Sequence, residues 1–236
     1  MTKKSLLLIS NSTLHGSGYL DHCAEEIKSF LKNKKTVLFV PYARPGGMTH
    51  DEYTKTARER FEKMGKTLHG IHEFTDKKQA INDHDAVFIG GGNTFILTTM
   101  LYKTGIVQPL KEAVEQGMPY IGTSAGSNIA CQTIQTTNDM PIMYPPSFDA
   151  LGLVPFNINP HYLDPNPNSK HMGETREKRI QEFFVFNDIP VIGLREGAML
   201  HCQNDKFTLK GTSGAILFQS NNEPKELTND EPINGL

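Results

Sequence analysis

The stretch Pro119-Tyr120-Ile121-Gly122-Thr123-Ser124-Ala125-Gly126-Ser127-Asn128-Ile129-Ala130 decides the fold expected for this chain. A short apolar run enters a Gly-x-Ser-x-Gly turn, and the residues after the turn have a helical pattern. In this strand–turn–helix context the serine points out of the sheet edge, and small neighbours let strand and helix pass closely. The pattern predicts Ser124 as a nucleophile and the N–H of Ala125 as an oxyanion donor at a helix N-terminus. The alternative is an idle serine in a glycine-rich turn.

Short apolar runs alternate with helical patterns on either side of this turn. The runs do not alternate with polar residues, which is typical of strands buried on both faces of a parallel sheet. We therefore predict an α/β fold with a mostly parallel central sheet flanked by helices. The expected strands are residues 6–9, 36–40, 67–71, 86–89 and 119–121, and the expected helices are 20–31, 51–64, 94–101 and 107–115.

The second half of the chain has a different character. Residues 132–168 are rich in Pro, Asn and Thr, as in a long functional or disordered loop. A helix at 174–184, a strand at 191–194 and a few antiparallel strands within 198–218 are expected after it. Neither a repeat nor a linker is evident, so residues 1–236 are predicted to form one domain, with 221–236 as a peripheral tail.

Composition disfavours several classes of protein. The 24 Lys+Arg and 26 Asp+Glu residues give a net charge of −2, which argues against nucleic-acid binding through bulk positive charge. No segment approaches the apolar length that spans a bilayer. The three cysteines are widely spaced and lack zinc-site spacing. We expect a cytoplasmic protein with no membrane or nucleic-acid partner.

A second glycine turn, Gly90-Gly91-Gly92-Asn93-Thr94, follows the strand expected at 86–89. It lacks the last glycine of Gly-x-Gly-x-x-Gly and the lysine of a P-loop, which disfavours a nucleotide site. We expect the N–H groups of Gly91 and Gly92 to complete the oxyanion hole, at the sheet edge where ligands of open α/β sheets bind. Asn93 is a candidate helix cap and substrate-binding residue. The alternative is that these glycines only form a tight turn between strand and helix and bind no ligand.

A serine nucleophile needs a base, and His161 is the strongest of the nine histidines. It follows Phe156-Asn157-Ile158-Asn159-Pro160, a strand-like run that would end at the ligand edge. Two carboxylates, Asp139 and Glu196, are candidates to orient its imidazole. Their sequence spacing does not decide between them.

Taken together, these motifs resemble the peptidase E family, α-aspartyl dipeptidases related to cyanophycinase. The resemblance extends from the first strand to about Gly197. It rests on six stretches: Leu8-Ile9-Ser10-Asn11-Ser12-Thr13, Gly90-Gly91-Gly92-Asn93-Thr94, Ser124-Ala125-Gly126, Thr136-Thr137-Asn138-Asp139-Met140-Pro141, Ile158-Asn159-Pro160-His161 and Gly173-Glu174-Thr175-Arg176-Glu177.

The resemblance implies a fold like that of class I glutamine amidotransferase domains. It also implies a cytoplasmic serine hydrolase that cleaves Asp-Xaa dipeptides without a metal or cofactor. Ser124 would be the nucleophile and His161 the base. Family members have the acid at either of two positions, and we favour Asp139 here, with Glu196 kept as a site residue in another role. A monomer or weak homodimer is expected.

Aspartate specificity requires a cation, and bidentate arginine suits a carboxylate best. Arg176 is the first candidate, and a solvated surface cation is the alternative. Thr123 departs from the family, which often has Trp before the serine, and we expect a roomier or more polar pocket. Two other functions remain open: cyanophycinase-like cleavage of β-aspartyl peptides, and ligand binding without catalysis.

Overall fold

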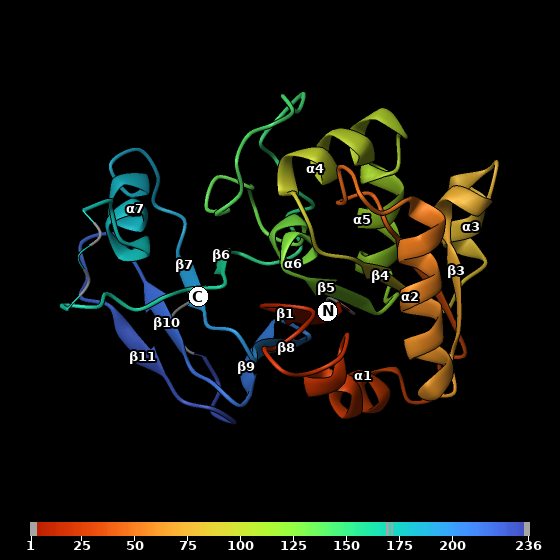
Figure 1. Cartoon of the computed structure of the whole chain (residues 1–236), viewed down its shortest axis with the longest axis horizontal. Helices are drawn as coiled ribbons and strands as arrows, with labels where there is room; N and C mark the ends of the chain where they lie inside the picture. Colours follow the sequence, from red (N-terminus) through yellow and green to blue (C-terminus); the bar gives the residue numbers. More distant parts are fainter. Residues whose placement is uncertain (1–3, 169, 171, 234–236) are drawn as a thin grey trace.

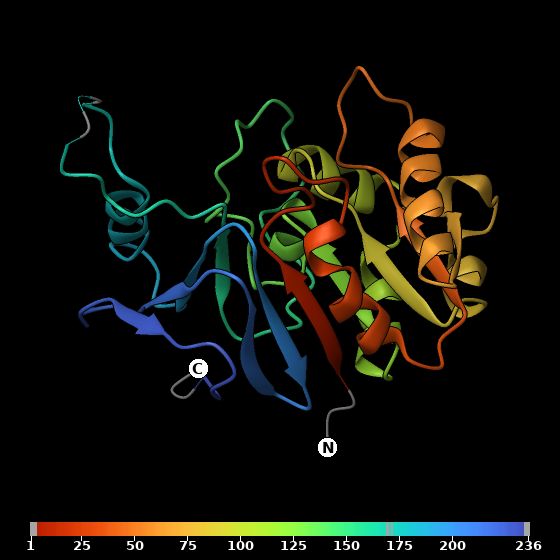
Figure 2. The ribbon, with the colours of Figure 1, turned by 60° about the horizontal axis from the view of Figure 1, so that its bottom comes forward.

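The computed structural model describes residues 4–168, 170 and 172–233, and it contains two β-sheets that lie side by side (Figure 1 and Figure 2). The larger sheet has the strand order β3-β2-β4-β5-β1-β8-β9. Strands β3 to β1 in this order are parallel, and β8 and β9 continue the sheet antiparallel. This confirms the mostly parallel central sheet. Its strands are β1 (Ser5–Ile9), β2 (Thr36–Val40), β3 (Thr67–Gly70), β4 (Ala86–Ile89), β5 (Tyr120–Thr123), β8 (Ala198–Gln203) and β9 (Lys206–Gly211).

Helices cover both faces of this sheet, because neighbouring residues of each strand point to opposite sides. In β2, Leu38 and Val40 join the core cluster with α3, α4, α5 and α6, whereas Val37 and Phe39 join the cluster with α1 and α2. The expected burial on both faces is therefore confirmed. The helices are α1 (Ala24–Leu31), α2 (His50–Lys63), α3 (Lys77–Asn82), α4 (Thr94–Lys103), α5 (Val107–Glu115), α6 (Ala125–Ile129) and α7 (Arg176–Phe183), with 3-10 turns at Asp21–Cys23 and Ile71–Glu73.

The smaller sheet has the order β11-β10-β7-β6, and α7 packs against it through Ile180 (Figure 1). Its strands are β6 (Asn157–Pro160), β7 (Val191–Leu194), β10 (Ala215–Phe218) and β11 (Lys225–Leu227). The sequence patterns did not predict this division into two sheets. Nor did they predict β11, which lies in the stretch expected to be a peripheral tail.

Two elements, α3 and β11, are too short to be predicted from the periodicity of the sequence. The six residues of α3 are too few to show a helical repeat, and β11 has three.

No helix in the described part of the chain is long and apolar enough to cross a membrane.

The turn at Ser124 is tight because two backbones nearly touch there. A Cβ atom on Gly126 would lie 2.1 Å from the carbonyl oxygen of Ile89, and one on Gly122 would lie 2.5 Å from the carbonyl oxygen of Gly126. Ser124 itself has a φ of 51°, a positive value that is unusual for a residue with a side chain. The two glycines of the motif therefore make room for the turn that presents Ser124.

Replacing Gly126 with alanine should destabilise the protein, because the new methyl group meets rigid backbone. We expect the free energy of unfolding to fall by roughly 1–3 kcal/mol or more, measured by urea denaturation. Gly46→Ala is the control, since no atom lies within 4 Å of the Cβ position there. Equal stability of the two variants would contradict this account of the turn.

Candidate active site

Ser124 and His161 face each other across the two sheets. The Ser124 Oγ lies 2.9 Å from Nε2 of His161. Ser124 directly follows β5 in the larger sheet, and His161 directly follows β6 in the smaller one. The structure thus brings together the two residues that the sequence suggested as nucleophile and base.

Glu196 holds the other side of the His161 ring. Its Oε1 lies 2.7 Å from Nδ1 of His161, and a carboxylate can only accept, so Nδ1 carries a proton. In the neutral ring Nε2 is then free to accept the hydrogen bond from the Ser124 hydroxyl. The side chains of His161 and Glu196 are 39% and 48% exposed, which leaves the group open to a substrate from solvent.

Strand pairing explains why these two residues meet. Strands β6 and β7 are parallel, with Pro160 opposite Leu194. His161 follows the first strand and Glu196 follows the second by two residues, so both emerge at the same sheet edge. This pairing joins segments more than 30 residues apart, which no local pattern reveals.

Asp139, which we favoured as the carboxylate for His161, lies elsewhere. Its Oδ2 accepts hydrogen bonds from the N–H and the hydroxyl of Thr94, at 2.7 and 2.6 Å, and lies 3.1 Å from the hydroxyl of Thr137. The geometry therefore corrects the preference for Asp139, because Glu196 is the carboxylate on the imidazole.

Two residues after β1 support the site, although the sequence analysis gave them no part in it. The Ser10 hydroxyl accepts from the N–H of His161 at 2.9 Å and donates to the carbonyl of Leu194 at 2.8 Å. Asn11 Oδ1 accepts from the N–H of Gly197 at 2.8 Å. Polar residues directly after a buried parallel strand were the available signal, since such strands end at the ligand edge.

The glycine turn lies against the nucleophile. A Cβ atom on Gly91 would lie 3.1 Å from Cβ of Ser124, and Gly92 has a φ of 145° with its Cβ position 2.3 Å from the carbonyl oxygen of Ala43. Among the described residues no acceptor bonds to the N–H of Gly91 or Gly92, and Ala125 begins α6, whose first N–H groups lack helical partners. Free donors thus gather beside Ser124.

Asn93 caps the helix that follows the glycine turn, as the sequence predicted. Its Oδ1 accepts from the N–H groups of Phe95 and Ile96, both at 3.1 Å, which caps α4. Its Nδ2 donates to the carbonyl of Met140 at 2.9 Å. The capping role is therefore confirmed, and the substrate-binding role stays a prediction.

Thr123 differs from the pocket-lining residue we expected. It is fully buried, and its hydroxyl has no hydrogen-bond partner among the described residues. The Oγ1 lies 3.6 Å from the Cβ position of Gly91. Thr123 therefore packs beneath the glycine turn and does not widen an open pocket.

Arg176 lines a hollow of about 550 Å³ together with Arg179, Glu174 and Asn138. Partial burial and the nearby positive charge of Arg179 lower the pKa of Arg176. Neither arginine forms an ion pair with another described residue. Asn138 connects the hollow to the site, because its Nδ2 donates to the carbonyl of Pro160 at 2.6 Å.

Arg195 is closer to Glu196 in sequence than Arg176 is, but carboxylates already neutralise its charge. Its guanidinium binds Asp164 through two hydrogen bonds of 2.7 and 2.6 Å and also binds Glu226. These carboxylates raise its pKa further above the ordinary value of arginine. A free anion therefore meets less competition at Arg176 than at Arg195.

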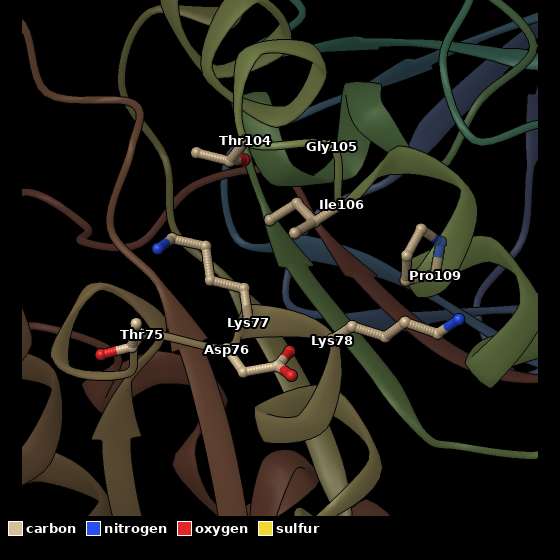
Figure 3. A pocket seen from close by; sticks show the side chains of 8 residues that line it. All are labelled: Thr75, Asp76, Lys77, Lys78, Thr104, Gly105, Ile106 and Pro109. Carbon is tan, nitrogen blue, oxygen red and sulfur yellow. The ribbon is translucent and has the colours of Figure 1, made fainter.

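Another hollow, of about 470 Å³, lies between the start of α3 and the turn after α4 (Figure 3). Lys77 and Lys78 line it, but Figure 3 shows their amino groups pointing in different directions. It contains none of the residues that surround Ser124. We assign it no part in the site.

Comparison with known proteins identifies the family. The model of peptidase family S51 matches residues 6–210. The chain belongs to peptidase family S51. It is 48% identical over 227 residues to a probable alpha-aspartyl dipeptidase of Drosophila melanogaster, covering 95% of this chain and 93% of that one. It is 50% identical over 223 residues to peptidase E of Streptomyces coelicolor, covering 94% and 90%.

Two solved structures share the fold of this S51 peptidase. A peptidase from an acI-B1 actinobacterium superposes with a TM-score of 0.73 at 19% identity, over 98% of this chain and 96% of that one. A protein from Listeria monocytogenes described as a putative peptidase E gives 0.66 at 24% identity, over 89% and 99%. At this level of identity they support the α/β architecture alone.

Removing the Ser10 hydroxyl should loosen the connection between the sheets. In Ser10→Ala the N–H of His161 and the carbonyl of Leu194 lose a buried partner, and we expect the free energy of unfolding to fall by roughly 1–3 kcal/mol. Ser124 should also react more slowly with a fluorophosphonate, because His161 is less well oriented. Ser29→Ala, an exposed serine on α1, is the control. Unchanged stability and labelling in Ser10→Ala would contradict this role.

Proposed function

We propose that this S51 peptidase is a serine-type dipeptidase that cleaves Asp-Xaa through an acyl-enzyme on Ser124. The observation that carries the proposal is the continuous chain of hydrogen bonds from Ser124 to His161 to Glu196. The names of the similar Drosophila and Streptomyces proteins support the substrate class.

In the first half-reaction the Ser124 Oγ attacks the scissile carbonyl carbon while His161 Nε2 takes the hydroxyl proton. The carbonyl oxygen becomes an oxyanion, and the N–H groups of Ala125, Gly91 and Gly92 are the donors we assign to it. His161 then gives the proton to the leaving nitrogen, and the C–N bond breaks. The second amino acid departs as a free amine, leaving the aspartyl ester on Ser124.

In the second half-reaction water replaces the amine. His161 takes a proton from the water as its oxygen attacks the ester carbon, and it returns the proton to Ser124 Oγ when the ester bond breaks. Glu196 stays ionised, keeps the tautomer with a proton on Nδ1, and stabilises the imidazolium that forms transiently.

The hollow beside α7 supplies the aspartate specificity in this proposal. An Asp-Xaa substrate brings a side-chain carboxylate that needs a cation, and Arg176 is unpaired among the described residues and partly withdrawn from solvent. Arg179 adds positive charge to the same hollow.

Ser124→Ala should abolish turnover of an α-Asp-Leu dipeptide. We expect kcat to fall by on the order of 10⁴-fold or more, measured by release of free leucine, because the acyl-enzyme cannot form. A β-Asp-Arg dipeptide assayed in parallel separates this function from cleavage of β-linked aspartyl peptides. Wild-type turnover by Ser124→Ala would refute the mechanism, and preference for the β-linked peptide would refute the substrate.

Arg176→Met should selectively impair cleavage of substrates with an N-terminal aspartate. Losing a charge-assisted hydrogen bond should lower kcat/KM for Asp-Leu by roughly 10- to 100-fold and leave the slow cleavage of Ala-Leu within about twofold. Lys178→Met is the matched control, because Lys178 is exposed on the same helix and does not line the hollow. Equal losses on Asp-Leu and Ala-Leu would exclude Arg176 as the carboxylate-binding residue.

A further inference from the structure

Asp139 has a role that the Ser124–His161–Glu196 chain leaves unexplained. Its carboxylate is half-buried in the loop that follows α6, yet its bonds go to Thr94 and not to His161. Thr94 is fully buried and lies two residues after Gly92, at the end of the glycine turn that we assign to the oxyanion. Because it bonds to Thr94, the Asp139 carboxylate supports the glycine turn.

Asp139 satisfies one of the free backbone donors at the N-terminus of α4. The N–H of Thr94 donates to Asp139, whereas the next two N–H groups donate to Asn93 Oδ1. The helix end therefore needs both side chains to satisfy its first donors, and a negative charge is favourable there. The hydroxyl of Thr94 also accepts from Nδ2 of Asn128 at 3.2 Å, which ties the same point to α6 behind Ser124.

The turn is held from the opposite side as well. The N–H of Asn93 donates to the carbonyl of Ala43 at 2.7 Å, and the hydroxyl of Tyr53 donates to the carbonyl of Gly91 at 3.2 Å. Asp139 supplies the remaining support, from the loop after α6. Without Asp139, Thr94 at the start of α4 would have only uncharged hydrogen-bond partners.

Consecutive residues of one loop reach both halves of the site. In the loop of residues 137–140, named here the clamp loop, Asn138 donates to the carbonyl of Pro160, next to His161. Asp139 binds Thr94, and the carbonyl of Met140 accepts from Asn93. The clamp loop therefore spans from the base to the glycine turn.

We propose that Asp139 is a positioning residue that holds the Gly91–Gly92 turn in place through Thr94, so that its N–H groups meet the oxyanion. The inference rests on the proposed function. It assigns Asp139 no proton transfer, because Nδ1 of His161 is occupied by Glu196. Loss of Asp139 should therefore slow the chemical step.

The test compares Asp139→Ala, Asp139→Asn and Glu196→Gln with the wild-type enzyme. For Asp139→Ala we expect kcat on Asp-Leu to fall on the order of 10²-fold, as when an oxyanion donor is lost, with KM within about threefold. The acidic limb of the pH profile of kcat/KM should stay in place. Asp139→Asn should recover part of kcat, since an amide oxygen still accepts from Thr94. Glu196→Gln should move the acidic limb to lower pH, because the imidazolium loses its counter-charge.

Asp85→Ala is the matched control for stability. Asp85 Oδ2 accepts from the N–H groups of Lys35 and Thr36 and from the Thr36 hydroxyl, at 2.8, 3.0 and 3.1 Å. Like Asp139, this carboxylate accepts three hydrogen bonds through one oxygen, but it lies at the opposite edge of the sheet, where β2 and β4 begin. Asp85→Ala should lose stability comparably but keep wild-type kcat.

A second readout separates this inference from the proposed function. The rate at which a fluorophosphonate modifies Ser124 also depends on oxyanion donors, and it does not require a dipeptide substrate. If wild type is labelled but does not cleave Asp-Leu, the proposed function fails and the labelling rates still decide the role of Asp139. Labelling of Asp139→Ala within twofold of wild type, or an acidic limb that moves as in Glu196→Gln, would overturn the inference.

If Asp139→Ala fails to fold, the Thr94→Val variant tests the inference instead. It removes the hydroxyl bond and keeps the N–H bond to Asp139. We expect a fall of roughly tenfold in kcat and in labelling rate, with an unmoved acidic limb. Wild-type rates in a folded Thr94→Val would overturn the inference equally.

Discussion

One buried hydroxyl links the two sheets of this protein beside Ser124 and His161. Ser10 follows β1, which pairs with β5 and so lies beside the strand that carries Ser124. Its hydroxyl accepts from His161 and donates to Leu194, and these residues belong to the ends of β6 and β7. Because an unpaired buried polar group costs roughly 1–3 kcal/mol, displacement of one sheet against the other is penalised at this point. The distance between nucleophile and base depends on that register.

Both reacting side chains also stand on unusual backbone. Ser124 has a φ of 51° and His161 a φ of 53°. A positive φ costs energy for residues with a side chain, and it persists only where the surroundings determine it fully. Here the N–H of Ser124 donates to the carbonyl of Ile9, and the N–H of His161 donates to Ser10. The polar end of β1 therefore stabilises both conformations.

Local charge matters more for this site than the net charge of −2. Arg195 is enclosed by two carboxylates, so its positive charge serves the structure of the smaller sheet. Arg176 and Arg179 share a hollow and lack described ion-pair partners, which leaves charge available for an anionic substrate. A nearly neutral chain can thus present a cationic pocket, because pairing differs from one arginine to the next.

Local patterns in the sequence by themselves determined the parallel sheet, the Gly-x-Ser-x-Gly turn and the residues that face the ligand edge. Such features depend on neighbours within a few positions: unalternating apolar strands, two glycines where backbones touch, a histidine after a strand. Only the tertiary structure decided that Glu196 and not Asp139 meets His161, that Asp139 binds Thr94 at the start of α4, and that the late strands form a second sheet. Each of these depends on the pairing of β6 with β7 and on the packing of the clamp loop against α4. Such contacts join residues 30 or more positions apart, so spacing along the chain does not encode them.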